Sequence, residues 1–160
     1  MVPFWTWLQE TPIIDKIGET GSLYNAFSVL HYFSIFVMVG TTALVDLRVM
    51  GLAARRQTVS QLAGQLFPWM WTAFAIATIS GFLEFAPEGA SFAPDPFFQA
   101  KLVLIVLAVV FAVIVQMGAP KWSQLPEIPA SAKIVAAISL LLWLAAIVLA
   151  LDVAAYSGLG

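Results

Sequence analysis

Four titratable side chains lie inside or at the ends of long apolar stretches. They are one imidazole, two carboxyl groups and one ammonium group: His31, Glu84, Lys101 and Asp152. Titratable groups are costly within a membrane, so each is by default a candidate for ligand binding or proton transfer. His31 is the only histidine, and the stretch around it has no charged residue between Glu19 and Asp46.

The apolar stretches predict the elements that must position these residues. The chain has 160 residues, of which 61% are hydrophobic and only 10% are charged, whereas about a quarter of the residues in a soluble domain are charged. Four segments could cross a bilayer core of roughly 30 Å at about 1.5 Å per residue: residues 22–50, 68–86, 96–118 and 131–156. We therefore predict an all-α, multi-pass membrane protein in which residues 1–160 form one up-down bundle of four helices.

Residues outside the spans carry further signals. Residues 4–19 are too polar to span, but Trp5 and Trp7 suit an interfacial helix at headgroup level. A flexible tail is the simpler alternative. The links after the first and third spans contain five basic residues: Arg48, Arg55, Arg56, Lys121 and Lys133. The N-terminal segment and the link before the third span contain only two, Lys16 and Lys101. This bias predicts that both termini lie outside the cytoplasm.

Helix starts can be predicted at two of the links. Thr58 and Gln61 have the spacing of a capping box, which predicts a short interfacial helix. Pro68 then fits the first turn of the second span. Asp95 followed by Pro96 predicts the N-cap and first residue of the third span.

In this topology the four titratable residues share one half of the bundle. One hypothesis is a shared polar site in which Lys101 pairs with Glu84 or Asp152, with His31 beneath them. The simpler interpretation is that the side chains of Glu84, Lys101 and Asp152 reach the lipid headgroups. His31 would then form a hydrogen bond with Ser34, a tyrosine or a backbone carbonyl.

Metal and haem chemistry has few candidate ligands in this sequence. There is no cysteine, which excludes thiolate metal sites and iron–sulfur clusters. His31 and Met38 are two turns apart on one helix, so they cannot bind one iron together. We expect no metal and no cofactor, and haem b at His31 is the alternative. No nucleophile–base pair is evident, so we predict no catalytic residue and no enzyme activity.

Two further sets of residues have predicted structural roles. Asp46 and Arg48, at the end of the first span, are expected to form ion pairs with neighbouring helix ends or to contact lipid headgroups. Small residues recur every four positions in two spans, a pattern that allows helices to approach closely. These residues are Ala73, Ala77, Gly81, Ala146, Ala150 and Ala154.

The order of several short motifs resembles a bacterial four-helix inner-membrane family of unknown function. The motifs run along nearly the whole chain: Trp7-Leu8 through Thr11-Pro12, Leu30-His31, Asp46-Leu47-Arg48 with Gly51, Pro68-Trp69, Gly81, Phe98 with Lys101, and Ser139 to Trp143. The layout is more distantly similar to copper-resistance D and cytochrome b561-type membrane proteins. The resemblance implies the bacterial cytoplasmic (inner) membrane, with the N- and C-termini in the periplasm.

This sequence departs from that family pattern at two positions. The resemblance implies a histidine near the end of the third span, where this chain has Gln116, and an arginine late in the fourth, where it has Asp152. A histidine pair for haem or metal is thus incomplete here. The resemblance supports the fold and weakens the haem hypothesis.

Three functions remain as hypotheses. The first is a non-catalytic membrane subunit, an accessory or anchor in the lipid bilayer that binds other membrane proteins or further copies of itself. The second is a redox subunit that binds haem b or quinone near His31. The third is a small homo-oligomeric transporter that uses Glu84, Lys101 and Asp152. The net charge of −2 argues against nucleic acid as a partner.

Overall fold

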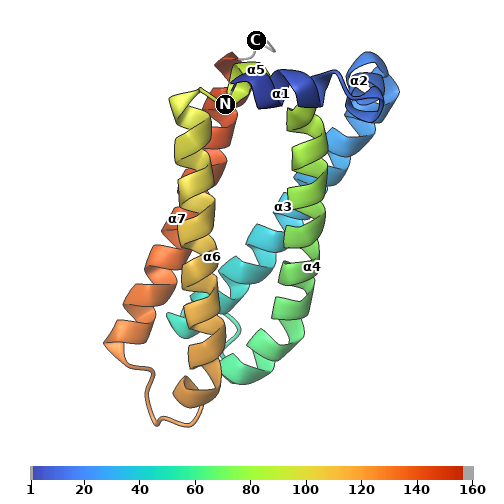
Figure 1. Cartoon of the computed structure of the whole chain (residues 1–160). Coiled ribbons are helices and arrows are strands. Elements are labelled where there is room, and N and C mark those ends of the chain that lie inside the picture. The colour runs from blue at the N-terminus through green and yellow to red at the C-terminus, as the bar shows by residue number, and fades with distance from the viewer. Residues whose placement is uncertain (1, 157–160) are drawn as a thin grey trace.

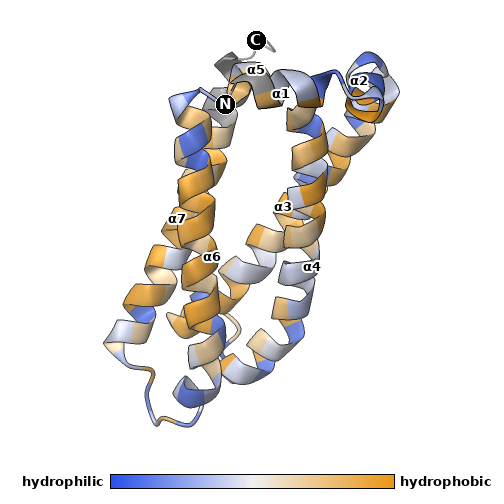
Figure 2. Ribbon diagram, viewed as in Figure 1, coloured by the Kyte–Doolittle hydropathy of each residue, from blue (hydrophilic) through white to orange (hydrophobic). Residues whose placement is uncertain are grey.

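The computed structural model describes the backbone of residues 2–156 and the side chains of residues 4–150, and every regular element in this part of the chain is helical. Four helices are long and apolar enough to cross a membrane: α3 (Gly21–Val49), α4 (Val59–Phe85), α6 (Pro96–Trp122) and α7 (Ala130–Tyr156). Figure 2 shows long hydrophobic stretches in these helices and the most hydrophilic residues near their ends. The predicted all-α fold with four membrane-compatible helices is confirmed.

The four long helices form two antiparallel hairpins, α3 with α4 and α6 with α7 (Figure 1). The hairpins contact each other through α3 with α7 and through α4 with α6. Residues 50–58 and 123–129 close the hairpins at one end, which we call the loop end. Four short helices lie at the opposite, capped end: α1 (Val2–Gln9), α2 (Pro12–Glu19), η1 (Ala86–Glu88) and α5 (Gly89–Phe92).

The N-terminal segment forms two short helices rather than one continuous helix. Thr11 has an extended backbone before α2, and Pro12 at the start of α2 has no N–H with which to continue α1. Ile14 and Ile17 are buried together with Ala86 of η1, so they hold α2 against the bundle. Figure 1 shows α1 lying across the ends of the long helices, an arrangement that suits an interfacial segment.

Helix α4 begins at Val59 and is longer than the predicted second span. The predicted capping box forms: the Gln61 N–H donates to Thr58 Oγ1 at 3.2 Å, and the Thr58 N–H donates to Gln61 Oε1 at 3.0 Å. The prediction of a separate helix before Pro68 is wrong, because α4 continues through this proline. The Pro68 side chain is exposed, so its ring displaces no packed neighbour and the helix loses one backbone hydrogen bond.

Helix α6 begins as the sequence predicts and ends later. Asp95 Oδ1 accepts a hydrogen bond from the Phe98 N–H at 2.8 Å, with Pro96 at the first position of the helix. The helix then continues past the predicted end at residue 118, through Pro120 to Trp122. Both prolines that fall inside helices thus lie near the loop end, within α4 and α6.

The core that joins the two hairpins lies mainly in the half of the bundle nearest the loop end. Its buried side chains come from all four long helices and include Val45, Met70, Ala112, Val115 and Trp143. On α3 these core residues begin only at Met38, and on α4 they end at Ala73. The half of the bundle nearest the capped end therefore relies on contacts within each hairpin, on the short helices and on the stacking of Phe85 of α4 on Phe98 of α6.

Candidate functional site

Three helices bring polar side chains together near the capped end. Ser28 of α3 donates a hydrogen bond from Oγ to Glu84 Oε1 of α4 at 2.8 Å. Lys101 of α6 lies within electrostatic range of the Glu84 carboxylate, and its ammonium nitrogen is 4.8 Å from the ring centroid of Phe98. We call Ser28, Glu84 and Lys101 the capped-end polar cluster. Two residues of the predicted shared site, Glu84 and Lys101, thus lie near enough to interact electrostatically.

Asp152, the third charged residue of the predicted shared site, lies outside the side chains that the structure describes. Its pairing with Lys101 therefore stays a prediction. Ala154 lies outside them too. Of the other small residues, Ala73, Ala77 and Ala146 are buried and Ala150 is half-buried.

His31 is held against α4 by its imidazole ring. Its Nδ1 lies 2.8 Å from the backbone oxygen of Ala77, and the Ser80 hydroxyl lies 3.5 Å from the same nitrogen. A carbonyl oxygen only accepts hydrogen bonds, so this contact needs a proton on Nδ1, and in the neutral imidazole the lone pair is then on Nε2. The environment matches the simpler interpretation, a hydrogen bond to a backbone carbonyl; Ser34 instead donates to Leu30 at 2.7 Å.

Gly81 makes room for the His31 ring. A Cβ atom at this position would lie 2.5 Å from His31 Cε1 and 2.9 Å from Nδ1, closer than non-bonded atoms approach. Gly81 therefore does more than continue a row of small residues along α4. It forms the notch in which the imidazole rests.

Asp46 and Arg48 have environments that differ from the ion pairs we expected. Arg48 Nε donates to the backbone oxygen of Gln57 at 2.6 Å, which fastens the link between α3 and α4 to the end of α3. Asp46 is completely buried, and within residues 4–150 neither of its carboxyl oxygens has a hydrogen-bond partner. The two residues are two positions apart on a helix, so their side chains point in roughly opposite directions.

Side-chain contacts join α4 and α6 at two places, one nearer the loop end and one nearer the capped end. Trp71 Nε1 donates to Gln116 Oε1 at 2.8 Å, and nearer the capped end Phe85 stacks on Phe98 with ring centroids 4.6 Å apart. Thr78 lies seven residues from both Trp71 and Phe85 and so shares their face of α4, yet it is exposed. We call this exposed stretch of α4, between the two contacts with α6, the open seam.

The comparisons with known proteins identify the family. The sequence matches a family of unknown function, DUF6644, over residues 4–154. The chain belongs to the DUF6644 family. Comparison with curated proteins and with solved structures finds no match. The predicted membership of a membrane family of unknown function is thus confirmed, while the more distant similarity to copper-resistance D and cytochrome b561-type proteins stays a prediction.

Two buried polar residues of this DUF6644 protein were not predicted as functional. Ser139 and Trp143 of α7 are buried, and among the described side chains neither Ser139 Oγ nor Trp143 Nε1 has a hydrogen-bond partner. The signal in the sequence is their spacing, since residues four apart share one helix face. Both belong to the motif from Ser139 to Trp143 that carries part of the family resemblance.

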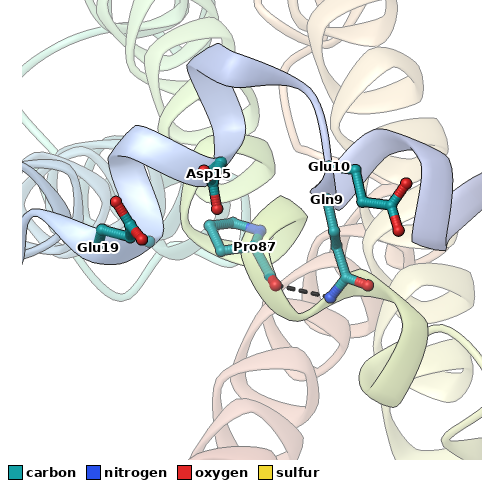
Figure 3. A pocket seen from close by; sticks show the side chains of 6 residues that line it. Gln9, Glu10, Asp15, Glu19 and Pro87 are labelled. Carbon is teal, nitrogen blue, oxygen red and sulfur yellow. Dashed lines mark hydrogen bonds between the residues drawn. The ribbon is translucent and has the colours of Figure 1, made fainter.

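The surface of the DUF6644 protein has a hollow of about 320 Å³ between α1, α2 and Pro87. Figure 3 shows Asp15 and Glu19 on the α2 side and Glu10 on the α1 side, while Gln9 Nε2 donates to the Pro87 backbone oxygen at 2.6 Å. All three carboxylates are exposed. Across the part of the chain that the structure describes, no three His, Cys, Asp or Glu residues are grouped to hold a metal ion.

Proposed function

We propose that this DUF6644 protein is a non-catalytic membrane subunit that anchors or completes a larger membrane assembly. The observation that supports this proposal is the open seam. Thr78 and Phe82, which is 46% exposed, lie one turn apart on α4 and form an exposed surface at the level between the two contacts with α6. The Trp71–Gln116 and Phe85–Phe98 contacts hold the two helices together on either side of this level.

Van der Waals packing makes a neighbouring helix a suitable occupant of the seam. Lipid tails are as apolar as leucine, so helices associate in a bilayer through close contact rather than through the hydrophobic effect. A side chain from an adjacent helix can fit between two fixed contacts more closely than a flexible acyl chain. We therefore expect the seam to receive an apolar membrane helix from another chain or from a second copy.

We infer the bacterial inner membrane as the location, with the loop end in the cytoplasm. Arg48, Arg55 and Arg56 all lie at the loop end, and Arg55 Nε donates to the Gly51 backbone oxygen at 2.6 Å. Basic residues are retained on the cytoplasmic side of membrane proteins. The short helices α1, α2, η1 and α5 would then lie on the periplasmic side.

The native mass of the protein, extracted with its surrounding lipid, tests the subunit proposal. We expect a particle that contains more protein than one chain of 17.3 kDa. Thr78→Trp should reduce this assembly, because the indole would fill the seam. Ile79→Trp is the matched control, since Ile79 is the next residue, is 63% exposed and points about 100° away around the helix. A wild-type particle with a single chain would contradict the proposal.

A redox role is the second candidate, and the orientation of His31 favours it. Histidines that bind a metal commonly donate their other ring N–H to a backbone carbonyl, which fixes the ring. The Nδ1–Ala77 contact of 2.8 Å has this form. His31 is the only histidine, so haem b would take one imidazole from this chain, and a quinol would use Nε2 as a hydrogen-bond acceptor.

Absorbance spectra of the oxidised and reduced protein separate the two candidates. A Soret band that is stoichiometric with this chain and is lost in His31→Ala would support the redox role. Ser34→Ala is the control, because Ser34 lies on the same helix and bonds only within it. A colourless wild-type protein, or a band that survives His31→Ala, would contradict haem binding at His31.

A further inference from the structure

The contact between α3 and α7 encloses a set of polar atoms that have no partner. Asp46 and Ser139 are 0% exposed and Trp143 is 2% exposed. Within the described part of the chain, four of their atoms lack a hydrogen bond: Asp46 Oδ1 and Oδ2, Ser139 Oγ and Trp143 Nε1. Buried polar groups in native proteins nearly always have a partner, from the protein or from ordered water. This set therefore needs an explanation.

Asp46 of α3 and Ser139 of α7 lie side by side where the two hairpins meet. The Ser139 hydroxyl lies beside the Asp46 carboxyl group, although it is outside hydrogen-bonding geometry. Trp143 is one turn along α7 on the same face as Ser139. Thr42 is one turn from Asp46 on α3, is buried, and donates its hydroxyl hydrogen to the Met38 carbonyl oxygen at 2.8 Å. Its Oγ1 can still accept a hydrogen bond.

We propose that Asp46, Ser139 and Trp143 form a binding site for internal water between α3 and α7. A water molecule both donates and accepts, so it can accept from the Trp143 N–H and donate to Asp46 and Ser139. Buried waters in proteins typically make about three hydrogen bonds to polar groups that otherwise have none. The site joins the two hairpins through hydrogen bonds where the remaining contacts between them are mostly apolar.

The chemistry of the site favours a neutral molecule over an ion. The Trp143 N–H is a donor without acceptor capacity, and its positive hydrogen would repel a cation. Val49, Val59 and Ala136, each at most 1% exposed, belong to the same buried apolar core as Trp143 and lie toward the loop end of their helices. Arg48 is the nearest basic residue along α3, and it bonds to Gln57 instead.

An experimental structure of the full chain in lipid, at a resolution that orders internal water, tests the site directly. We expect a density peak within hydrogen-bonding distance of Trp143 Nε1 and of at least one Asp46 oxygen. Two results would overturn the proposal. One is a direct hydrogen bond between Asp46 and Trp143 that leaves no space for water. The other is a peak with the short contacts and many oxygen ligands of a cation.

Resonance Raman spectroscopy gives a second test in the folded protein. Subtracting the spectrum of Trp143→Phe from that of the wild type isolates one indole among the six tryptophans. We expect the signature of a hydrogen-bonded indole N–H, retained in Asp46→Asn and lost in Asp46→Leu, which fills the site with apolar atoms. A free N–H in the wild type would contradict the proposal even where an Asp46 variant does not fold.

Discussion

At the scale of single residues, the contact between His31 and Gly81 fixes how α3 lies on α4. The imidazole is bonded to Ala77, and its ring occupies the space where Gly81 lacks a side chain. The same contact decides which ring nitrogen is available to a ligand. The position of the His31 ring, and with it the ring nitrogen that a ligand could reach, therefore depends on Gly81.

Gly81→Ala should destabilise the protein. The new methyl group would lie 2.5 Å from His31 Cε1, and inserting a carbon atom into a packed contact typically lowers the free energy of unfolding by about 1–3 kcal/mol. Unfolding followed by circular dichroism in lipid–detergent micelles measures the change. Gly40→Ala is the control, because nothing lies within 4 Å of a Cβ there. It should raise stability by about 0.5–1 kcal/mol.

A double variant separates crowding from other effects of the new methyl group. His31→Ala removes the ring, so adding Gly81→Ala to His31→Ala should cost little or nothing further. If Gly81→Ala were equally destabilising with and without the imidazole, the proposed packing of His31 in the Gly81 notch would be incorrect.

The sequence could nominate single residues but not their partners. His31 and Gly81 both stood out, one as the only histidine and the other in a row of small residues. Their contact depends on the register between α3 and α4, which neither pattern encodes. Asp46 was assigned an ion pair because charged residues at helix ends usually face solvent or headgroups. Its burial against Ser139 follows from tertiary packing alone.

At the scale of the elements, hydropathy located all four long helices, and local signals located some of their ends. Asp95 and Thr58 both cap helices as predicted, since an N-cap depends on residues within one turn. Pro68 misled the prediction, because a proline in a helix interior usually ends or kinks it. Its exposed position on α4 could not be deduced before the packing was known.

Thr58→Ala tests the capping box at the start of α4. Loss of the side-chain acceptor for the Gln61 N–H should lower the free energy of unfolding by about 1 kcal/mol. Thr58→Ser keeps the hydroxyl oxygen and should lie close to the wild type. The two variants are compared in the same micelle unfolding experiment, and equal stability of Thr58→Ala and Thr58→Ser would show that the cap contributes nothing.

At the scale of the whole molecule, the two hairpins share a core near the loop end and separate along the open seam. Sequence patterns predicted four packed helices but not this asymmetry. The angle between hairpins depends on which side chains meet, such as Trp71 with Gln116 and Phe85 with Phe98. These contacts join residues that are far apart in the sequence, so no local sequence pattern predicts them.

Cysteine labelling tests the orientation of the bundle in its membrane. The natural chain has no cysteine, so each introduced thiol is the only target. Ser91→Cys, at an exposed position of α5 at the capped end, should react with an impermeant maleimide on intact cells. Arg56→Cys, exposed in the link at the loop end, should react only after permeabilisation. The reverse pattern would place the loop end outside the cytoplasm.

Cross-linking from the open seam tests the subunit proposal most directly. A photoactivatable group attached to Thr78→Cys in native membranes should capture a polypeptide, either another membrane protein or a second copy of the chain. The same group on Ile79→Cys, which points about 100° away from Thr78 around the helix, should capture much less. Equal capture from both positions, or products that contain only lipid at Thr78→Cys, would contradict the account of this protein as a subunit whose seam receives a neighbouring helix.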